Sequence, residues 1–126
     1  MKKKIIESDE APSPIGPYSQ AVLSGNTLFV SGQVALDRRS GELNMSDIET
    51  ETSQVMKNLE AVLNEAGMKF SNVVKCSIFL KDMSDFIKVN AVYGKYFPTD
   101  PPARETVQVA MLPLNVNVEI SLIAIQ

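Results

Sequence analysis

The sequence contains no histidine and no tryptophan, and its single cysteine is Cys76. Without histidine, neither a Ser-His-Asp nor a Cys-His nucleophilic site can form within the chain, and a histidine-based zinc site is excluded as well. A lone cysteine forms neither an intrachain disulfide nor a thiolate zinc site. The P-loop and G-x-G-x-x-G signatures are also absent. We therefore expect no metal, and acid–base chemistry must rely on Glu, Asp, Tyr, Lys, Cys or water.

Basic residues are few, because 12 Lys and Arg against 15 Asp and Glu give a net charge of −3. Lys2-Lys3-Lys4 is interpreted as a solvated tail and Arg38-Arg39 as part of a solvated turn. Nucleic-acid-binding proteins usually carry a basic patch or stripe, so nucleic acid is not an expected partner. No apolar run approaches the roughly 20 residues of a membrane span, and none resembles a secretory signal. We expect a cytoplasmic protein.

A chain of 126 residues with 44% hydrophobic and 21% charged residues is typical of one globular domain. A domain of this size buries roughly two thirds of the surface that its unfolded chain exposes. One core fits within that limit, but little room is left for a deeply enclosed site. A neighbouring subunit could supply a missing wall.

Two segments have the pattern of amphipathic helices. The first has a capping box at residues 46–49 and ends at Gly67, a residue suited to a helix C-terminus. The second is capped by Asp82 or Ser84 and ends before Pro98. Its stripe consists of Phe86, Val89, Asn90, Tyr93 and Phe97.

Five segments are predicted to be strands. Residues 18–23 and 27–30 form a hairpin around a Ser-Gly-Asn turn, and residues 73–80 alternate so that Cys76 lies on an apolar face. We interpret Cys76 as a structural residue. Two further strands cover residues 103–111 and 116–125. The order of strands and helices predicts an α+β sandwich with a mixed sheet and helices on one face.

Each of the last two strands has a polar face that carries one ion. Arg104 lies on one of these faces and Glu119 on the other, opposite in charge. If the strands are neighbours, Arg104 and Glu119 could line one site, in which the guanidinium fork holds a carboxylate and the glutamate orients or deprotonates water. A cross-strand salt bridge on an exposed face explains the same pattern, and pattern alone favours it.

Six short segments occur in the order found in a known family. Each is weak by itself, but together they run over nearly the whole chain. The sequence therefore resembles the Rid family, named for reactive intermediate deaminase and also called the YjgF family. The segments are Ile15-Gly16-Pro17-Tyr18-Ser19-Gln20, Ser31-Gly32-Gln33, Lys81-Asp82, Val89-Asn90-Ala91-Val92-Tyr93, Pro102-Ala103-Arg104 and Val118-Glu119-Ile120.

The resemblance implies a chorismate-mutase-like α+β sandwich over residues 1–126, with a mixed sheet of about six strands and two helices on one face. It implies a homotrimer whose sheets form a central barrel and whose clefts lie between subunits. It further implies hydrolysis of small 2-imino acids, such as 2-iminopropanoate and 2-iminobutanoate, to 2-oxo acids and ammonia. No cofactor is expected for this reaction.

Position by position, the resemblance assigns Arg104 as the clamp for the substrate carboxylate and Glu119 as the group that positions or activates water. The other residues expected to bind substrate are Tyr18, Ser31, Gly32, Asn90 and Thr106. Thr106 stands where many family members have cysteine, and threonine suffices if that position acts through its backbone N–H.

Two departures from the family pattern concern residues near Arg104. Glu105 replaces a usually small or apolar residue and points away from Arg104 into a valine-rich face, where a charge needs a partner or solvent. Met111 occupies a position that is often basic.

Two other functions stay open. One is an endoribonuclease or translation-inhibiting activity, which is also attached to the family. The other is non-catalytic binding of small carboxylates in the Arg104 pocket. The acidic balance and the lack of histidine weigh against the first, and Glu119 argues for catalysis over the second.

Overall fold

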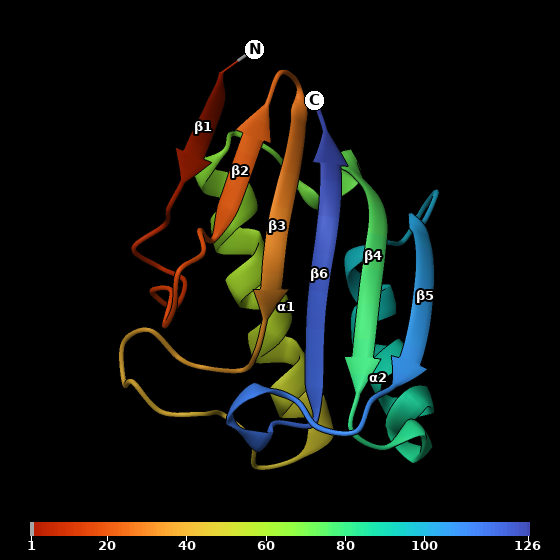
Figure 1. The fold of residues 1–126 in the computed structure, drawn as a ribbon. Coiled ribbons are helices and arrows are strands. Elements are labelled where there is room, and N and C mark those ends of the chain that lie inside the picture. Colours follow the sequence, from red (N-terminus) through yellow and green to blue (C-terminus); the bar gives the residue numbers. More distant parts are fainter. Residues whose placement is uncertain (1) are drawn as a thin grey trace.

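The computed structural model describes residues 2–126 as a six-stranded sheet with both helices packed on one face (Figure 1). This confirms the expected α+β sandwich. The strands are β1 (Lys3–Ile6), β2 (Ala21–Ser24), β3 (Thr27–Gln33), β4 (Val73–Leu80), β5 (Ala103–Gln108) and β6 (Val118–Ile125), and the helices are α1 (Ile48–Glu65) and α2 (Phe86–Tyr93).

The strands lie in the order β1-β2-β3-β6-β4-β5. β4 and β5 run parallel, and the other neighbouring pairs are antiparallel. Parallel neighbours need a long crossover, and α2 supplies it between β4 and β5. The C-terminal strand β6 lies in the middle of the sheet, between β3 and β4. As a result β4 separates β5 from β6.

β1 is not predicted from the sequence, in which the N-terminal lysines are interpreted as a solvated tail. In the structure Lys3–Ile6 pairs antiparallel with β2, and Ile6 lies opposite Ala21. Ile6 is buried while the other three residues of β1 are exposed. Lysine on a short edge strand discourages pairing with other chains, and one buried residue gives no alternation that a sequence pattern could reveal.

Several boundaries also differ from the prediction. The strands expected at residues 18–23 and 103–111 are shorter, and the strand expected at 27–30 extends to Gln33. α1 is capped by Asp47, whose side chain accepts a hydrogen bond from the Thr50 N–H at 2.7 Å, so the capping box expected at 46–49 is wrong by one residue. Gly67 follows α1 with φ +73°, which confirms it as the residue that ends this helix.

The core lies between the helices and the inner face of the sheet. Cys76, Ile78 and Leu80 alternate along β4 with no exposed surface, which confirms Cys76 as a buried structural residue. Burial of each Leu, Val or Met side chain contributes about 1.5–3 kcal/mol. The residues that α1 contributes are Val55, Met56, Leu59, Val62 and Leu63.

The opposite side of the sheet, which we call the open face, is not covered by α1 or α2 (Figure 1). Phe29 is 48% and Val107 41% exposed there. Glu105 points to this face, pairs with Lys75 at 2.8 Å and accepts a hydrogen bond from Ser77. Its charge therefore has both a partner and solvent, which resolves the conflict with its valine-rich surroundings.

Within residues 2–126, no helix is long and apolar enough to cross a membrane.

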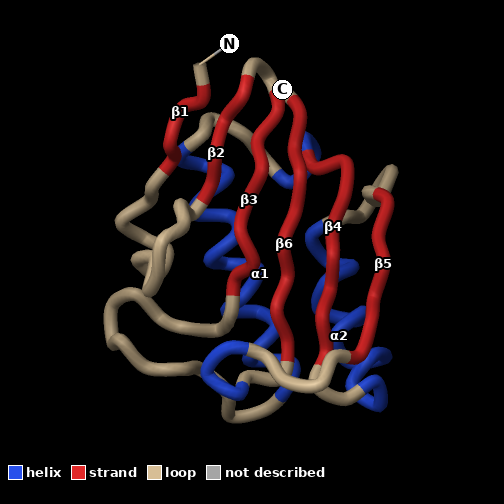
Figure 2. The backbone as a smooth tube through the Cα atoms, in the orientation of Figure 1, coloured by secondary structure: helices blue, strands red, loops and turns tan. Residues whose placement is uncertain are grey.

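A long loop joins β3 to α1 and passes below the sheet, as the tan tube in Figure 2 shows.

Candidate functional site

Arg104 lies on the helix side of β5. It pairs in register with Cys76 of β4, whose side chain is buried in the core, so both side chains leave the same face. The guanidinium Nη1 donates a hydrogen bond to Asn90 Oδ1 at 2.8 Å. The guanidinium carbon Cζ lies 5.0 Å from the ring centre of Tyr93 and 5.6 Å from that of Phe86.

All three partners of Arg104 come from one stripe of α2. Phe86, Asn90 and Tyr93 are spaced by four and three residues, which places them on one side of a helix. The stripe itself is predicted from the sequence, but no role is assigned to its aromatic members there. Their contacts with the guanidinium are missed, although a helical stripe facing an arginine-bearing strand is a signal that could have suggested them.

The positive charge of Arg104 has no carboxylate partner within the described chain. The ion pairs among residues 2–126 are Arg39–Glu10 and Lys75–Glu105. Arg104 is partly buried, and its contacts are an amide oxygen and two aromatic rings, all uncharged. A partly desolvated arginine without a counter-ion favours an anionic ligand, and the guanidinium fork matches the paired oxygens of a carboxylate or a phosphate.

Two hydroxyl groups on the same side of the sheet also lack a hydrogen-bond partner. They are Thr106 Oγ1 and Tyr93 Oη, both buried. Burial raises the pKa of Tyr93, and the adjacent Cys76 thiol raises it further. Tyr93 therefore stays a neutral phenol. Buried polar groups normally have partners, so an unpaired hydroxyl two residues from Arg104 is suited to a ligand or to water.

Glu119 points to the open face. It lies opposite Phe79 of β4, while its neighbours Val118 and Ile120 are fully buried on the helix side. Glu119 forms part of an open cavity of about 350 Å³, which we call the Glu119 pocket. The residues that line it are Ile15, Tyr18, Ser31, Gly32, Val34, Pro113, Leu114 and Glu119.

A β-bulge brings Gly32 against Glu119. The register between β3 and β6 shifts between Val30 and Gln33. A side-chain Cβ at Gly32 would stand 2.7 Å from Glu119 Cδ, closer than real contacts allow. The adjoining Ser31 is held by a 2.6 Å hydrogen bond from its Oγ to the Ser19 carbonyl. The bulge therefore creates the space that the Glu119 carboxyl occupies.

The Glu119 carboxyl is partly desolvated by this wall. Burial raises the pKa of Glu119 above its ordinary value of 4.5. A carboxylate of raised pKa is a better proton acceptor than an exposed one, because burial stabilises its protonated form. Tyr18, which is 49% exposed, borders the same cavity. This pocket can position water beside a base.

The strand that carries Glu119 is anchored to α1 by a buried acid. Glu51 is fully buried, and one of its carboxylate oxygens accepts hydrogen bonds from the Asn117 and Val118 N–H groups at 2.8 and 3.3 Å. The other oxygen accepts from Asn117 Nδ2 at 2.8 Å. The preceding turn presents Leu114 to the Glu119 pocket with φ +59°. No pattern in the sequence points to Glu51 or Leu114 as a functional residue.

Within one chain, Arg104 and Glu119 do not line one site. The condition that their strands are neighbours is not met, because β4 lies between β5 and β6. The two side chains also leave opposite faces of the sheet, which rules out the salt bridge that pattern alone favours. Alternation separates the two sides of each strand, but it does not show which of those sides faces the helices once the strands share one sheet.

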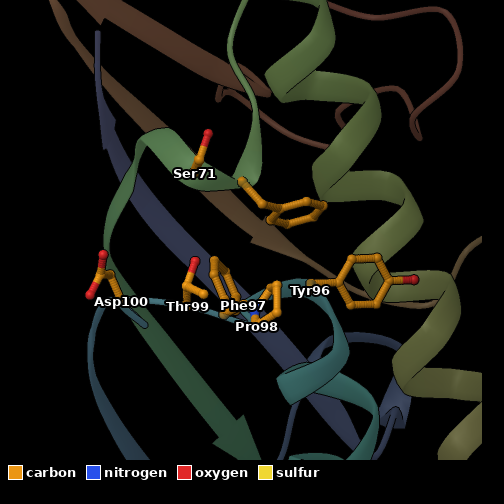
Figure 3. Close-up of a pocket in the computed structure, with 7 residues that line it drawn as sticks. Ser71, Tyr96, Phe97, Pro98, Thr99 and Asp100 are labelled. Atoms are coloured by element: carbon orange, nitrogen blue, oxygen red, sulfur yellow. The ribbon is translucent and has the colours of Figure 1, made fainter.

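The other expected residues divide between the same two places. Asn90 and Thr106 lie on the Arg104 side, and Tyr18, Ser31 and Gly32 lie with Glu119. A further cavity of about 210 Å³ contains none of them (Figure 3). It lies beside the packed rings of Phe70, Tyr96 and Phe97.

Comparison with known proteins identifies close relatives of this chain. The model of the family described as Endoribonuclease L-PSP matches residues 8–126. A mouse protein named 2-iminobutanoate/2-iminopropanoate deaminase is 48% identical over 98% of this chain and 92% of its own length. The structure of YyfA from Yersinia pestis, of the conserved Rid protein family, is 44% identical with a TM-score of 0.96, covering 99% of this chain and 100% of that one. Escherichia coli TdcF, solved with bound serine, is 36% identical with a TM-score of 0.93 and 98% coverage of both chains.

Proposed function

This chain belongs to the endoribonuclease L-PSP family, the Rid family that its motifs indicate, and on that premise we propose that it hydrolyses small 2-imino acids to 2-oxo acids and ammonia. The name of the mouse relative supports this reaction, since 2-iminobutanoate and 2-iminopropanoate are small 2-imino acids. The serine bound to TdcF is likewise a small molecule with a carboxylate.

The observation that carries the proposal is the unpaired charge of Arg104. The guanidinium is oriented by Asn90 and flanked by aromatic rings, and no carboxylate of the described chain neutralises it. A substrate carboxylate supplies the missing anion. Charged hydrogen bonds of this kind contribute about 1.5–3 kcal/mol each. Arg104 thereby fixes one end of the substrate and directs its C=N carbon.

The proposed active site needs two copies of the chain. Arg104 and Glu119 leave opposite faces of one sheet, so a cleft that holds both must combine the Arg104 side of one subunit with the Glu119 pocket of another. The open, partly apolar character of the Glu119 pocket and of the open face fits such an assembly. We propose a homotrimer with three equivalent clefts between subunits, which is the assembly that the resemblance to the Rid family implies.

In the proposed reaction, Glu119 accepts a proton from water while the water oxygen bonds to the imine carbon. The C=N π electrons move to nitrogen, which takes the proton that Glu119 has just accepted and gives a carbinolamine. Glu119, again a carboxylate, then takes the hydroxyl proton as the C=O bond forms and passes it to nitrogen, so that the C–N bond breaks and ammonia leaves. Each step uses groups of the protein and water, and a base of this kind contributes roughly 10²–10⁴-fold to the rate.

The test supplies the imine in place, from an amino-acid oxidase or a threonine dehydratase, and follows its loss directly. Arg104→Ala should abolish the acceleration and Glu119→Gln should lower it about 10²–10⁴-fold, whereas Arg39→Ala, at an exposed arginine, should not change it. Normal turnover by folded Arg104→Ala would overturn the assignment.

The family description offers a ribonuclease as the second candidate. RNA cleavage or salt-dependent RNA binding by metal-free protein, with no effect on imine lifetime, would favour it. Carboxylate binding without any change in imine lifetime would instead indicate a small-molecule binding protein.

A further inference from the structure

We propose that Phe86 and Tyr93 are positioning residues that hold the Arg104 guanidinium in a fixed orientation without neutralising it. Together with Asn90 they form what we call the arginine cradle, a stripe on α2 that faces β5. The inference rests on the proposed function, because it assigns the cradle the task of presenting Arg104 to the substrate carboxylate.

The partners that the cradle supplies to Arg104 are all uncharged. A carboxylate beside Arg104 would fix the guanidinium equally well, but it would also cancel the charge that must bind the ligand. The aromatic faces attract a cation through their quadrupole, and the Asn90 amide oxygen accepts one hydrogen bond. None of these groups carries a formal negative charge. The cradle therefore restrains Arg104 and leaves its full charge for a ligand.

The cradle also restrains the plane of the Arg104 guanidinium and leaves donors in it for a ligand. A guanidinium has five N–H donors in one plane, and Asn90 engages Nη1. A bidentate carboxylate needs two parallel donors in that plane, held at the correct angle. Contact with two rings and one amide limits rotation of the plane, whereas a free arginine side chain would lose conformational entropy when the ligand binds.

The two aromatic residues of the cradle differ in burial. Tyr93 is 5% exposed and belongs to the core, but Phe86 is only partly buried and lies at the first position of α2. Phe86 packs against the edge of the core, and its ring centre also lies 5.6 Å from the Arg104 guanidinium carbon. Because Phe86 is less buried than Tyr93, its replacement disturbs the core less, and it is the better position at which to test the cradle.

The experiment compares ring removal with ring retention at Phe86. Phe86→Leu keeps an apolar side chain but removes the ring, whereas Phe86→Tyr retains an aromatic ring. Ile87→Leu is the matched control, because Ile87 is the next residue of α2 and is 79% exposed. Binding of 2-oxobutanoate, the product of the proposed reaction, is measured by calorimetry beside that of its uncharged amide. Imine hydrolysis is measured in parallel.

We expect Phe86→Leu to weaken 2-oxobutanoate binding roughly 2- to 30-fold, the range that corresponds to a cation–π contact. It should leave the weak binding of the amide unchanged, because the amide lacks the charge that Arg104 recognises. KM for the imino acid should rise more than kcat falls. Phe86→Tyr and Ile87→Leu should stay within about twofold of wild type. Thermal unfolding of each variant shows that the fold is retained.

The two proposals fail in different ways. If wild-type protein does not hydrolyse imines, the proposed function is wrong, while carboxylate binding still reports on the cradle. If wild type is active and Arg104→Ala is not, but Phe86→Leu binds 2-oxobutanoate like wild type, the function stands and the cradle is overturned. Equal losses for 2-oxobutanoate and its amide would also overturn it, since they would indicate a general packing defect.

Discussion

The carboxyl group of Glu119 occupies the space in which any residue other than glycine at position 32 would place its Cβ. That Cβ would lie 2.7 Å from Glu119 Cδ and 3.0 Å from Oε1. The bulge in β3 and the side chain on β6 therefore fit each other only because residue 32 has no side chain. The position of the proposed base depends directly on this glycine.

Gly32→Ala should displace the Glu119 carboxyl and lower kcat/KM for imine hydrolysis about 100-fold, since a misplacement of about 1 Å at a catalytic group costs that much. Gly94→Ala is the matched control. A Cβ at Gly94 meets no atom within 4 Å and the residue has φ −61°, so activity should be unchanged. Wild-type kcat/KM in a folded Gly32→Ala protein would show that the close contact does not position the base.

The activity should depend on the ionisation of Glu119. Burial raises the pKa of this carboxyl above 4.5, and the base must be ionised to take a proton from water. The rate should therefore rise with increasing pH through the raised pKa and level off above it. Glu119→Gln should lose this acid limb together with about 10²–10⁴-fold in rate. If the folded Glu119→Gln variant kept an acid limb with the same midpoint in its pH–rate profile, that limb would belong to a group other than Glu119.

Thr106→Val should affect stability and ligand binding in opposite directions. The buried Oγ1 has no partner, and an unpaired buried hydroxyl costs about 1–3 kcal/mol, so the near-isosteric valine should raise the free energy of unfolding by about 1 kcal/mol. If the hydroxyl bonds the ligand, 2-oxobutanoate affinity should fall about fivefold, while Thr106→Ser retains it. Unchanged affinity in the valine variant would mean that residue 106 contacts the ligand through its backbone N–H and not through its side chain.

Glu51→Ala should lower the free energy of unfolding by about 3 kcal/mol or more. The carboxylate is fully buried and accepts three hydrogen bonds from Asn117 and Val118, whose donors would lose their partner. Glu51→Gln should cost less, because its carbonyl oxygen still accepts both backbone N–H groups. Urea unfolding measures both variants. Equal stability of the Ala variant and wild type would mean that water replaces the carboxylate.

The Lys75–Glu105 pair should contribute an acid-sensitive part of the stability. Lys75 and Ser77 hold the pKa of Glu105 below its ordinary value of 4.5. A lowered pKa in the folded state means that the contribution is present above pH 4.5 and is lost as the pH falls through the lowered value. Wild type should therefore lose more of its Tm than Glu105→Gln when the pH falls below 4.5. Parallel Tm curves would show that the pair adds nothing.

Much of the fold follows from periodicity in the sequence. The strand at Val73–Leu80 and both helices are predicted because their apolar residues repeat with the period of a strand or a helix. Such a pattern is local, so it does not depend on how the elements are arranged in the fold. β1 is missed because a four-residue edge strand with one buried side chain has no period to detect. The motif series also identifies the family, which the comparisons confirm.

For the candidate site, the sequence indicates the residues but not their positions in space. The sequence by itself determined which residues are the candidates for the proposed chemistry: the absence of histidine left few groups, and the motifs pointed to Arg104 and Glu119. Only the tertiary structure decided where they lie. Sheet order places β4 between their strands, and register sends the two side chains to opposite faces. Both depend on contacts between residues far apart in the chain, and a local pattern of alternating residues contains no information about such contacts.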